Sequence, residues 1–364
     1  MKKIFFTPGP SQIFPTIPKH LKEALRKDIL SLSHRSSRFK KIFYKTVDDL
    51  RQLLNIPKSH HIFFLSSGTE VMERVIENCV EKHSFHFVNG GFSQRFFETA
   101  IELKKVPFRH QVAWGDGFDF DKVEINKKTE LICVTQNETS TGVALDKKDI
   151  VLLKKNHPDK LLAVDIVSSA PYVNIDYSFA DLVFFSVQKG FGLPAGLAVL
   201  IVSPEAIEKS KYLINKGVNV GSYHNFINLL KYADKGQTPE TPNVLAIYLL
   251  GQVIKDMFKL GIRNIRKAIE KKANILYNFF EESNLYRPFI KQSRFRSKTV
   301  IVVEVKNGSS NIIKKLTNKG YIVGNGYQKF KDKQIRIANF PAHSLASVKQ
   351  LLVYFKKYER QKNL

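Results

Sequence analysis

Three segments of the sequence carry side chains that could act together in chemistry. A turn of small residues, Ser66–Thr69, follows the apolar run that ends at Leu65. A second apolar run ends in the carboxylate of Asp165, and a third is followed by Lys189 and a Gly-rich stretch. A turn that opens a helix presents backbone N–H groups to phosphate, and a semi-buried lysine can lose its proton and act as a Schiff-base nucleophile. Together the segments supply an anion site, a carboxylate and a nucleophilic amine.

Each segment alone has a plainer interpretation. Ser67 and Glu70 fit a capping box, so the turn could simply start a helix. Asp165 could be a turn residue, and Lys189 could extend along an apolar surface to solvent. In combination and in this chain order they are the parts that a pyridoxal 5′-phosphate enzyme needs, because a carboxylate can keep the pyridine nitrogen protonated. We therefore predict pyridoxal 5′-phosphate as the cofactor, with Lys189 and Asp165 as catalytic residues.

The elements that must position these side chains alternate along the middle of the chain. The short apolar runs are His61–Leu65, Phe85–Asn89, Leu131–Thr135, Leu161–Val164, Leu182–Phe185 and Leu197–Val202. The helical patterns between them include Glu70–Lys82, Ser93–Lys104 and Lys147–Lys155. This alternation predicts an α/β fold with a doubly wound, mainly parallel sheet. Ligands bind such sheets beyond the carboxyl ends of the strands.

The C-terminal part of the chain has a different pattern. One long helical pattern runs from about Val244 to Glu282. The later strand patterns are Thr299–Val305, Gly320–Val323 and Gln334–Ala338, and the later helical patterns are Ser310–Asn318 and Leu345–Tyr358. We predict a large cofactor-binding domain at residues 15–255 and a smaller α+β domain at residues 256–364. Residues 1–14 are expected to pack with the smaller domain or to cross the site.

The composition is that of an ordinary globular protein with a basic surface. Of 364 residues, 43% are hydrophobic and 25% are charged, and the formal net charge is +25. The basic residues are spread along the chain without aromatic-interleaved clusters, so the charge does not predict nucleic-acid binding. A Lys-rich surface, or a field that steers phosphorylated substrates, accounts for it. The sequence contains no run of 18 apolar residues, so it predicts no membrane span.

The two cysteines, Cys79 and Cys133, lie in apolar segments without CxxC spacing. They predict two buried, reduced thiols in a cytoplasmic protein. No secretion signal is expected, because Thr7-Pro8-Gly9-Pro10 interrupts any apolar run at the N-terminus. We assign no metal ligands.

Eight short motifs are spread over nearly the full length of the chain. They are Thr7-Pro8-Gly9-Pro10, Ser33-His34-Arg35, Ser66-Ser67-Gly68-Thr69, Asn137-Glu138-Thr139, Val164-Asp165-Ile166-Val167-Ser168-Ser169, Gln188-Lys189, Pro194-Ala195-Gly196-Leu197 and Thr241-Pro242. Through these motifs the chain resembles the class V aminotransferases of fold type I, and among them it is most similar to the phosphoserine aminotransferases. The Asn-Glu-Thr, Asp and Gln-Lys motifs, in register, are the specific ones.

The resemblance implies a role for each matching residue. Lys189 would form the Schiff base and shuttle protons, and Asp165 would pair with the pyridinium nitrogen. The other implied cofactor contacts are Thr139 at the phenolic oxygen, Phe92 stacked on the ring where relatives often have Trp, Gly68, Thr69 and Gln188 at the phosphate, and Thr241 at the phosphate of the other subunit. The resemblance therefore implies a homodimer with two shared sites.

On the substrate side, the resemblance implies that Arg336 binds the α-carboxylate, a task that suits a guanidinium. It also implies that His34 and Arg35 recognise a substrate phosphate. The implied reaction is transamination between phosphoserine and 2-oxoglutarate in serine biosynthesis. Small amino acids and 2-oxo acids are the expected partners.

Three features depart from the phosphoserine pattern. Thr69 stands where the relatives carry an arginine, and Glu240 stands where an amide is usual. The loop Gly326–Lys331 lacks the relatives' His-Arg pair, so Lys329 or Lys331 would have to supply charge. These departures leave open a class V aminotransferase that acts on alanine, serine or glyoxylate.

Two further alternatives belong to other classes. Cysteine desulfuration needs a mobile nucleophilic cysteine and usually a histidine before the lysine, but Gln188 precedes Lys189. A non-catalytic nucleic-acid binder would hold no cofactor and would lose affinity steeply with salt.

Overall fold

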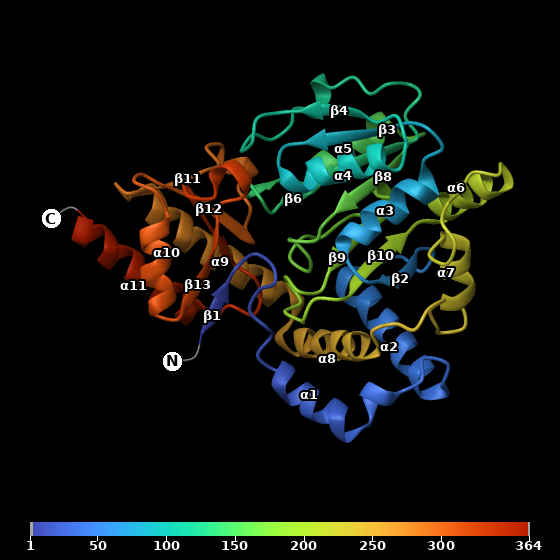
Figure 1. The fold of residues 1–364 in the computed structure, drawn as a ribbon, viewed down its shortest axis with the longest axis horizontal. Helices are drawn as coiled ribbons and strands as arrows, with labels where there is room; N and C mark the ends of the chain where they lie inside the picture. The colour runs from blue at the N-terminus through green and yellow to red at the C-terminus, as the bar shows by residue number, and fades with distance from the viewer. Residues whose placement is uncertain (1–2, 363–364) are drawn as a thin grey trace.

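The computed structural model describes residues 3–362, whose strands form a seven-stranded sheet, a five-stranded sheet and a two-stranded ribbon. In Figure 1 the seven-stranded sheet and its helices occupy one side of the molecule, and the five-stranded sheet occupies the other with the C-terminal helices. The chain between β1 (Ile4–Phe6) and α1 (Ile17–Arg26) passes between these two parts.

The seven-stranded sheet is mainly parallel, as predicted. In spatial order its strands are β2 (His61–Leu65), β10 (Ala198–Val202), β9 (Leu182–Ser186), β8 (Leu161–Asp165), β5 (Leu131–Thr135), β3 (Ser84–Val88) and β4 (Phe108–Gln111). Only β10 pairs antiparallel with its neighbours. The other six strands therefore run in one direction, and their carboxyl ends meet at one edge of the sheet.

Helices cover both faces of this sheet, which confirms the doubly wound prediction. Alternate strand residues point to opposite faces, so Ile62 and Phe64 join one apolar cluster while Phe63 and Leu65 join another. The first cluster packs under α1, α2 (Ser37–Leu54), α5 (Lys147–Asn156) and α8 (Val244–Leu260). The second packs under α3 (Gly68–Cys79), α4 (Gly91–Glu102), α6 (Pro204–Asn215) and α7 (Phe226–Ala233).

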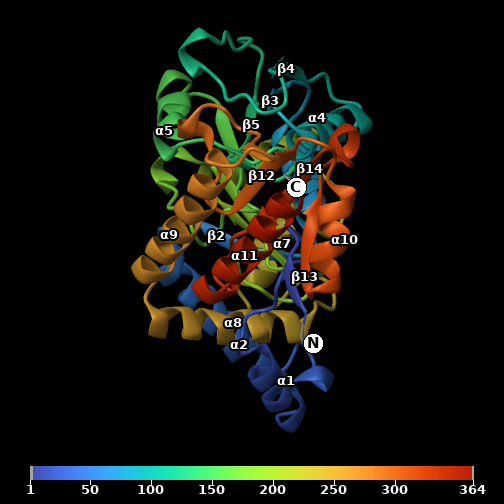
Figure 2. The same cartoon turned by 90° about the vertical axis from the view of Figure 1, so that its left-hand side faces the viewer.

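The five-stranded sheet joins the N-terminal strand to the C-terminal part of the chain. Its spatial order is β1, β13 (Tyr321–Asn325), β14 (Gln334–Ala338), β12 (Val300–Val305) and β11 (Tyr286–Pro288), with β1 parallel to β13 and the other pairs antiparallel. An apolar cluster packs this sheet against α9 (Ile262–Glu281), α10 (Ser310–Asn318) and α11 (Leu345–Lys362). Figure 2 shows the molecule with these helices facing the reader.

The long helical pattern from about Val244 to Glu282 is not one continuous helix in the structure. The chain forms α8 and α9 instead, separated at Gly261, where φ is +78°. Glycine adopts this left-handed conformation without the steric cost that a Cβ would impose. The proposed boundary between residues 255 and 256 lies near the end of α8, and the two-domain division stays a prediction.

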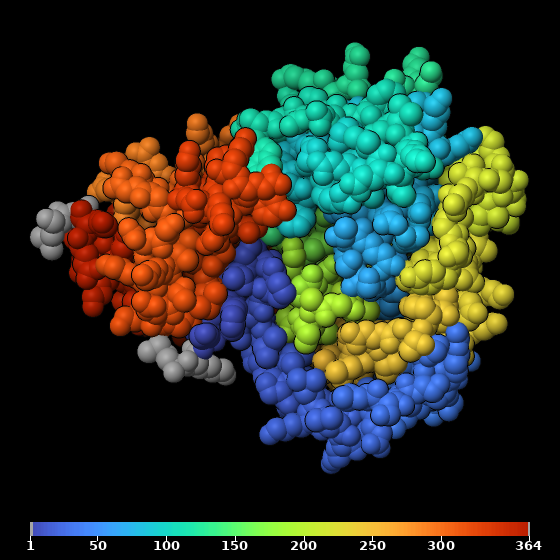
Figure 3. Space-filling model, viewed as in Figure 1, coloured from blue at the N-terminus to red at the C-terminus, as the bar shows by residue number. Residues whose placement is uncertain are grey.

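The N-terminal segment bridges the two parts of the molecule. While β1 pairs with β13, the Ser11 N–H donates to the Gln188 carbonyl at 3.1 Å and the Phe14 N–H donates to the Gly192 carbonyl at 2.8 Å. In Figure 3 the dark blue N-terminal residues lie at the surface between the orange C-terminal part and the green residues of the middle of the chain. It therefore crosses the loop that carries Lys189.

Both cysteines are buried and unpaired, as predicted. Cys79 ends α3 and Cys133 lies in β5, and burial raises the pKa of both thiols. Within residues 3–362, none of the helices combines the length and the apolar character needed to span a bilayer.

Candidate active site

Four predicted site residues meet at the carboxyl edge of the seven-stranded sheet. Asp165 is the last residue of β8, and Lys189 lies in the loop after β9. Phe92 lies in the first turn of α4, which follows β3. Thr139 follows β6 (Asn137–Glu138), which pairs with β7 (Val143–Ala144) in the ribbon after β5. The parallel sheet brings these residues together because their strands end at the same edge.

The amine of Lys189 is buried in a polar and aromatic setting. The residue is 6% exposed, and its Nζ donates to Thr139 Oγ1 at 3.2 Å. The same nitrogen lies 5.0 Å from the centre of the Phe92 ring. Burial lowers the pKa of Lys189 to about 8, against the opposing charge of Asp165. The neutral, nucleophilic form of the amine is therefore more populated near neutral pH than it is in an exposed lysine.

The carboxyl group of Asp165 is also buried. It is 3% exposed, and its Oδ1 accepts from the Val167 N–H at 2.7 Å. Burial raises the pKa of Asp165 to about 7, while the Val167 N–H and the charge of Lys189 oppose the rise. Among residues 3–362 it has no ion pair. A positively charged N–H placed beside it would favour the carboxylate form.

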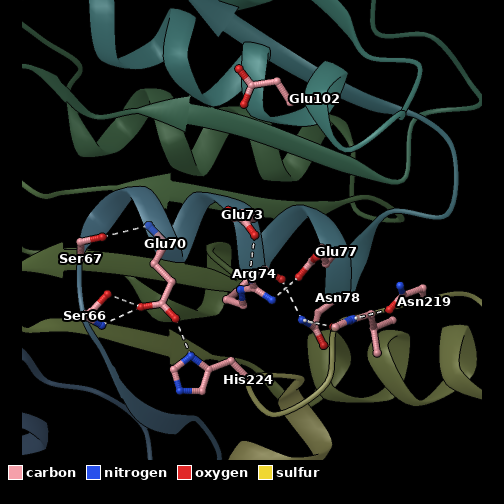
Figure 4. A network of polar contacts seen from close by, with 12 residues as sticks. Ser66, Ser67, Glu70, Glu73, Arg74, Glu77, Asn78, Glu102, Asn219 and His224 are labelled. Carbon is pink, nitrogen blue, oxygen red and sulfur yellow. Dashed lines mark hydrogen bonds and ion pairs between the residues drawn. The ribbon is translucent and has the colours of Figure 1, made fainter. Parts of the chain in front are cut away.

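The Ser66–Thr69 turn lies between β2 and α3, and one detail of its capping differs from the prediction. Ser67 Oγ accepts from the Glu70 N–H at 3.1 Å, which is the expected half of a capping box. The Glu70 carboxylate, however, accepts from the N–H and hydroxyl of Ser66 rather than from the Ser67 N–H. Figure 4 shows that Glu70 also points to His224, which directs its carboxylate away from the box geometry.

The N–H groups of this turn are not equally available. The Gly68 N–H donates to Ser186 Oγ at 2.9 Å, and a Cβ at Gly68 would lie 3.0 Å from the same oxygen. Thr69 is exposed, and its N–H belongs to the first turn of α3, where N–H groups have no intrahelical partner. The Thr69 N–H is thus the better placed of the two to receive an anion.

The residues present fit pyridoxal 5′-phosphate. The Gln188 side-chain oxygen is buried without a hydrogen-bond partner among the described residues, which marks unfilled polar space beside Lys189. Around that space lie an amine for a carbonyl carbon, a buried carboxylate for a ring nitrogen and an aromatic face at Phe92. The helix start after Ser67 offers N–H groups for a phosphate.

Arg336 reaches the same region from β14. Its Nε donates to the Asn325 carbonyl at 2.8 Å, and its Nη1 donates to the Thr139 carbonyl at 3.3 Å. Its guanidinium lies 5.2 Å from the centre of the Tyr327 ring. These contacts fix the plane of the guanidinium, while Nη2 has no hydrogen bond to residues 3–362 and can donate to a ligand.

The Gly326–Lys331 loop was expected to supply a charged side chain. It contributes the aromatic ring of Tyr327 to the site instead. The Tyr327 ring lies 5.5 Å from that of Phe92, and a Cβ at Gly91 would collide with its Cε1. Lys329 and Lys331 both lie at least partly at the surface, and Lys329 Nζ lies 5.5 Å from the centre of the Trp114 ring. The loop therefore presents an aromatic wall to the site.

Glu138 is a site residue to which the sequence interpretation gave no role. Its buried carboxylate accepts from the N–H groups of Phe92 at 3.1 Å, Ser93 at 2.8 Å and Ser140 at 3.0 Å, and from the hydroxyls of both serines. The first N–H groups of α4 stabilise this charge. Glu138 thus joins the Thr139 ribbon to the helix turn of Phe92. The sequence feature that points to Glu138 is its position in the Asn137-Glu138-Thr139 motif.

Among residues 3–362, three predicted site residues form no hydrogen bond with Lys189. His34 Nε2 is buried without a partner among residues 3–362, and Thr241 is exposed. Arg35 donates to Gln237 Oε1 at 2.7 Å and to the Thr238 and Pro239 carbonyls, both at 3.1 Å. Arg35 is thereby tied to the segment that precedes Thr241.

Comparison with known proteins identifies relatives across nearly the whole chain. A sequence model of the aminotransferase class-V family matches residues 4–328. A putative phosphoserine aminotransferase from Mycolicibacterium vanbaalenii is 27% identical over 340 residues, which cover 92% of this chain and 89% of that protein.

Solved structures include a relative with higher sequence identity. A phosphoserine aminotransferase from Cytophaga hutchinsonii is 44% identical with a TM-score of 0.96, and the match covers 98% of each chain. An alanine–glyoxylate aminotransferase from a Nostoc species is 21% identical with a TM-score of 0.83, covering 98% of this chain and 95% of that one. The second likeness shows a shared fold alone.

Proposed function

The chain belongs to the class V aminotransferases, and we propose that it transfers the amino group between phosphoserine and 2-oxoglutarate, a step of serine biosynthesis. It is a transaminase whose cofactor is pyridoxal 5′-phosphate. The observation that carries the proposed substrate is the 44% identity, over 98% of both chains, to a structure named as a phosphoserine aminotransferase.

The proposed chemistry assigns proton transfer to Lys189. Bound pyridoxal phosphate supplies a carbonyl that takes up an amino group and a ring that accepts electrons. Lys189 Nζ removes the α-proton of the substrate and holds it for return, which its pKa of about 8 permits. Thr139 Oγ1, 3.2 Å away, orients that nitrogen. Asp165 keeps a proton on the ring nitrogen, and Phe92 supports the ring face.

The remaining roles concern the phosphate and the substrate. We assign the phosphate to the Thr69 N–H and the Gln188 side chain, with Gly68 giving the turn its close approach to Ser186. Arg336 binds the substrate α-carboxylate. Its two backbone contacts and its position on the Tyr327 ring support this role, because they hold the guanidinium at one end.

We propose a homodimer in which Thr241, His34 and Arg35 serve the site of the other subunit. The support is that Arg35 is held on the segment before Thr241, whereas Lys189 of the same chain donates to Thr139 and not to any of the three. Mixing inactive Lys189→Ala and Arg35→Ala chains tests this. Hybrid dimers with one intact site should recover activity, and mixtures that stay inactive would contradict the shared site.

A second candidate is transamination of alanine, serine or glyoxylate. Thr69 and the aromatic wall at Tyr327 favour it, because neither supplies a fixed cation for a substrate phosphate. Lys329, beside the Trp114 ring, offers only a point charge.

The deciding experiment compares single half-reactions of the cofactor-loaded enzyme with phosphoserine, serine, alanine and glutamate. Release of the 2-oxo acid from phosphoserine, with at least about tenfold lower kcat/KM for serine and alanine, is expected because a bound phosphate contributes charge-assisted hydrogen bonds. Comparable release from alanine would instead establish the second candidate. The Lys189→Ala variant serves as the control for background.

We also propose a cytoplasmic location. The two unpaired, buried thiols of Cys79 and Cys133 support a reducing compartment.

A further inference from the structure

His224 lies between two carboxylates from different segments of the chain. Its Nδ1 is 2.5 Å from Glu70 Oε1, and its Nε2 is 2.9 Å from Glu240 Oε2. The side chain is 5% exposed. A neutral imidazole has a single N–H, so both nitrogens can donate to carboxylates only when the ring is protonated. With both carboxylates ionised, the geometry therefore requires an imidazolium.

The charged groups around His224 agree with that state. Glu70 faces it from α3, Glu240 from the segment before α8, and the Tyr223 ring lies 4.0 Å from it on its own loop. His34 lies within the field of Glu240. Burial alone would lower the pKa of His224, but hydrogen bonds to Glu240 and Glu70 outweigh burial and raise it to about 9.

One end of this contact orders the Ser66–Thr69 turn. Glu70 Oε2 accepts from the Ser66 N–H at 2.8 Å and from the Ser66 hydroxyl at 2.5 Å. Although burial raises the pKa of Glu70, the hydrogen bonds from His224 and Ser66 hold it at about 2. Figure 4 shows the carboxylate between Ser66 and the His224 ring. The imidazolium therefore holds a carboxylate that also fixes the backbone of the turn.

The other end of the contact orders the segment before Thr241. Glu240 is the neighbour of Thr241, and its carbonyl accepts from Thr238 Oγ1 at 2.8 Å. Arg35 holds the same segment through Gln237, Thr238 and Pro239. With Glu240 bound to His224, the segment is held from two sides.

The loop that carries His224 is itself anchored on α3. The Phe226 N–H donates to Asn78 Oδ1 at 2.9 Å, and Asn78 Nδ2 donates to the Val220 carbonyl at 3.4 Å. A Cβ at Gly221 would lie 2.8 Å from Arg74 Nη1, so the loop packs closely on the helix. Figure 4 shows Glu70, Arg74 and Asn78 along the same helix. His224 is therefore held rigidly beside the start of α3.

We propose that His224 is a positioning residue for the cofactor phosphate: it neutralises Glu240 and Glu70 and holds the Ser66–Thr69 turn and Thr241 in place. The inference rests on the proposed function in one respect, that this turn and Thr241 receive the phosphate. It explains how Glu240 can stand where relatives have an amide. A carboxylate next to a phosphate-binding residue is unfavourable unless a cation neutralises it.

The test measures the affinity of the apo chain for pyridoxal 5′-phosphate and for pyridoxal, which lacks the phosphate. His224→Gln should weaken binding of pyridoxal phosphate at pH 7.5 by about tenfold or more, because two buried carboxylates lose their cation. Pyridoxal affinity should change by less than about twofold, because it makes no phosphate contact. The double variant His224→Gln/Glu240→Gln should return to within about threefold of wild type.

The pH dependence gives a second measurement. Both ligands react with Lys189, so the titration of that residue cancels when the affinity for pyridoxal phosphate is divided by the affinity for pyridoxal. In the wild type this ratio should fall as pH rises through about 9, where His224 loses its proton. Glu240→Gln removes one partner that raises the His224 pKa, so the fall should move to lower pH. This variant carries the test if His224→Gln does not fold.

Three results would overturn the inference. They are unchanged pyridoxal phosphate affinity in His224→Gln, an equal loss for pyridoxal, and an unmoved pH midpoint in Glu240→Gln. If His224→Gln weakens cofactor binding as expected but the wild-type enzyme releases no 2-oxo acid from phosphoserine, only the proposed substrate is refuted. An enzyme that turns over phosphoserine while His224→Gln binds cofactor normally would refute only the role of His224.

Discussion

Gly9 lies directly against the side chain of Lys189. A Cβ at position 9 would be 2.8 Å from Cε and 3.4 Å from Cγ of that lysine, and the φ of Gly9 is +153°. The nearby Ser11 N–H donates to the Gln188 carbonyl. The N-terminal segment therefore forms one wall beside the reactive amine. The Thr7–Pro10 motif carried part of the family resemblance, and this contact supplies a physical reason for its glycine.

Gly9→Ala should lower kcat about tenfold or more with a modest loss of stability, because the new methyl group displaces Lys189 from its working position. Steady-state kinetics and thermal unfolding measure the two effects. Gly217→Ala is the matched control, since Gly217 also has positive φ, +76°, but a Cβ added there would meet no atom within 4 Å. That variant should lose about 1 kcal/mol of stability and keep its kcat. Equal kcat in Gly9→Ala and wild type would contradict the prediction.

The rate at which the apo enzyme captures pyridoxal phosphate should rise with pH and level off above about pH 8. Only the neutral amine reacts, and burial lowers the pKa of Lys189 to about 8. Because the folded chain releases this proton earlier than the unfolded chain, the contribution of Lys189 to stability increases between about pH 8 and 10.5. Stopped-flow absorbance measures the capture rate.

Asp165→Asn provides the control for this pH profile. The charge of Asp165 raises the pKa of Lys189, so its removal should shift the midpoint to lower pH. A wild-type capture rate that keeps rising well beyond the pKa of about 8 would show that Lys189 titrates as an ordinary exposed lysine.

Arg336→Lys should raise the KM for the amino acid substrate by about ten- to a hundredfold while kcat changes less. Lysine cannot reproduce the planar contacts to the Asn325 and Thr139 carbonyls or the contact with the Tyr327 ring. Arg287→Lys is the control, because Arg287 is an exposed residue of β11 in the same sheet. A similar increase in KM for both variants would contradict the role of Arg336 in binding the substrate carboxylate.

Glu138→Gln should destabilise the protein by about 1–3 kcal/mol, because the amide NH₂ group would face N–H donors that now bind a carboxylate. It should also weaken cofactor binding, since Glu138 joins Phe92 to the ribbon of Thr139. Thermal unfolding and cofactor titration measure these effects. The exposed Glu124→Gln should change neither quantity, and a Glu138→Gln chain that matches this control would contradict the prediction.

The order of chemical groups along the chain predicted that side chains following several strands would gather at one edge of the sheet. The strands ending near Leu65, Asp165 and Phe185 were visible as short apolar runs, and in a parallel sheet such ends share one edge. In the structure Lys189 and Thr139 lie together at this edge, where the lysine Nζ donates to the threonine hydroxyl. Helix start signals are also local, so the sequence predicts the cap at Ser67, whose Oγ accepts from the Glu70 N–H.

Other contacts had no local signal. The break between α8 and α9 depends on a single residue, Gly261, within a continuous helical pattern. The turn of Glu70 towards His224 joins separate elements, and so does the packing of Gly9 on Lys189. Neither contact has a periodicity that a sequence window can reveal.

The amino-acid sequence by itself determined the α/β fold, the family and the side chains available for chemistry, because these depend on short-range patterns and on motifs kept in register. Only the tertiary structure decided which polar groups neutralise one another, as His224 does for Glu70 and Glu240. The physical reason is that a hydrogen bond or ion pair depends on distances of a few ångströms between segments far apart in the chain, and these exist only once the core has packed.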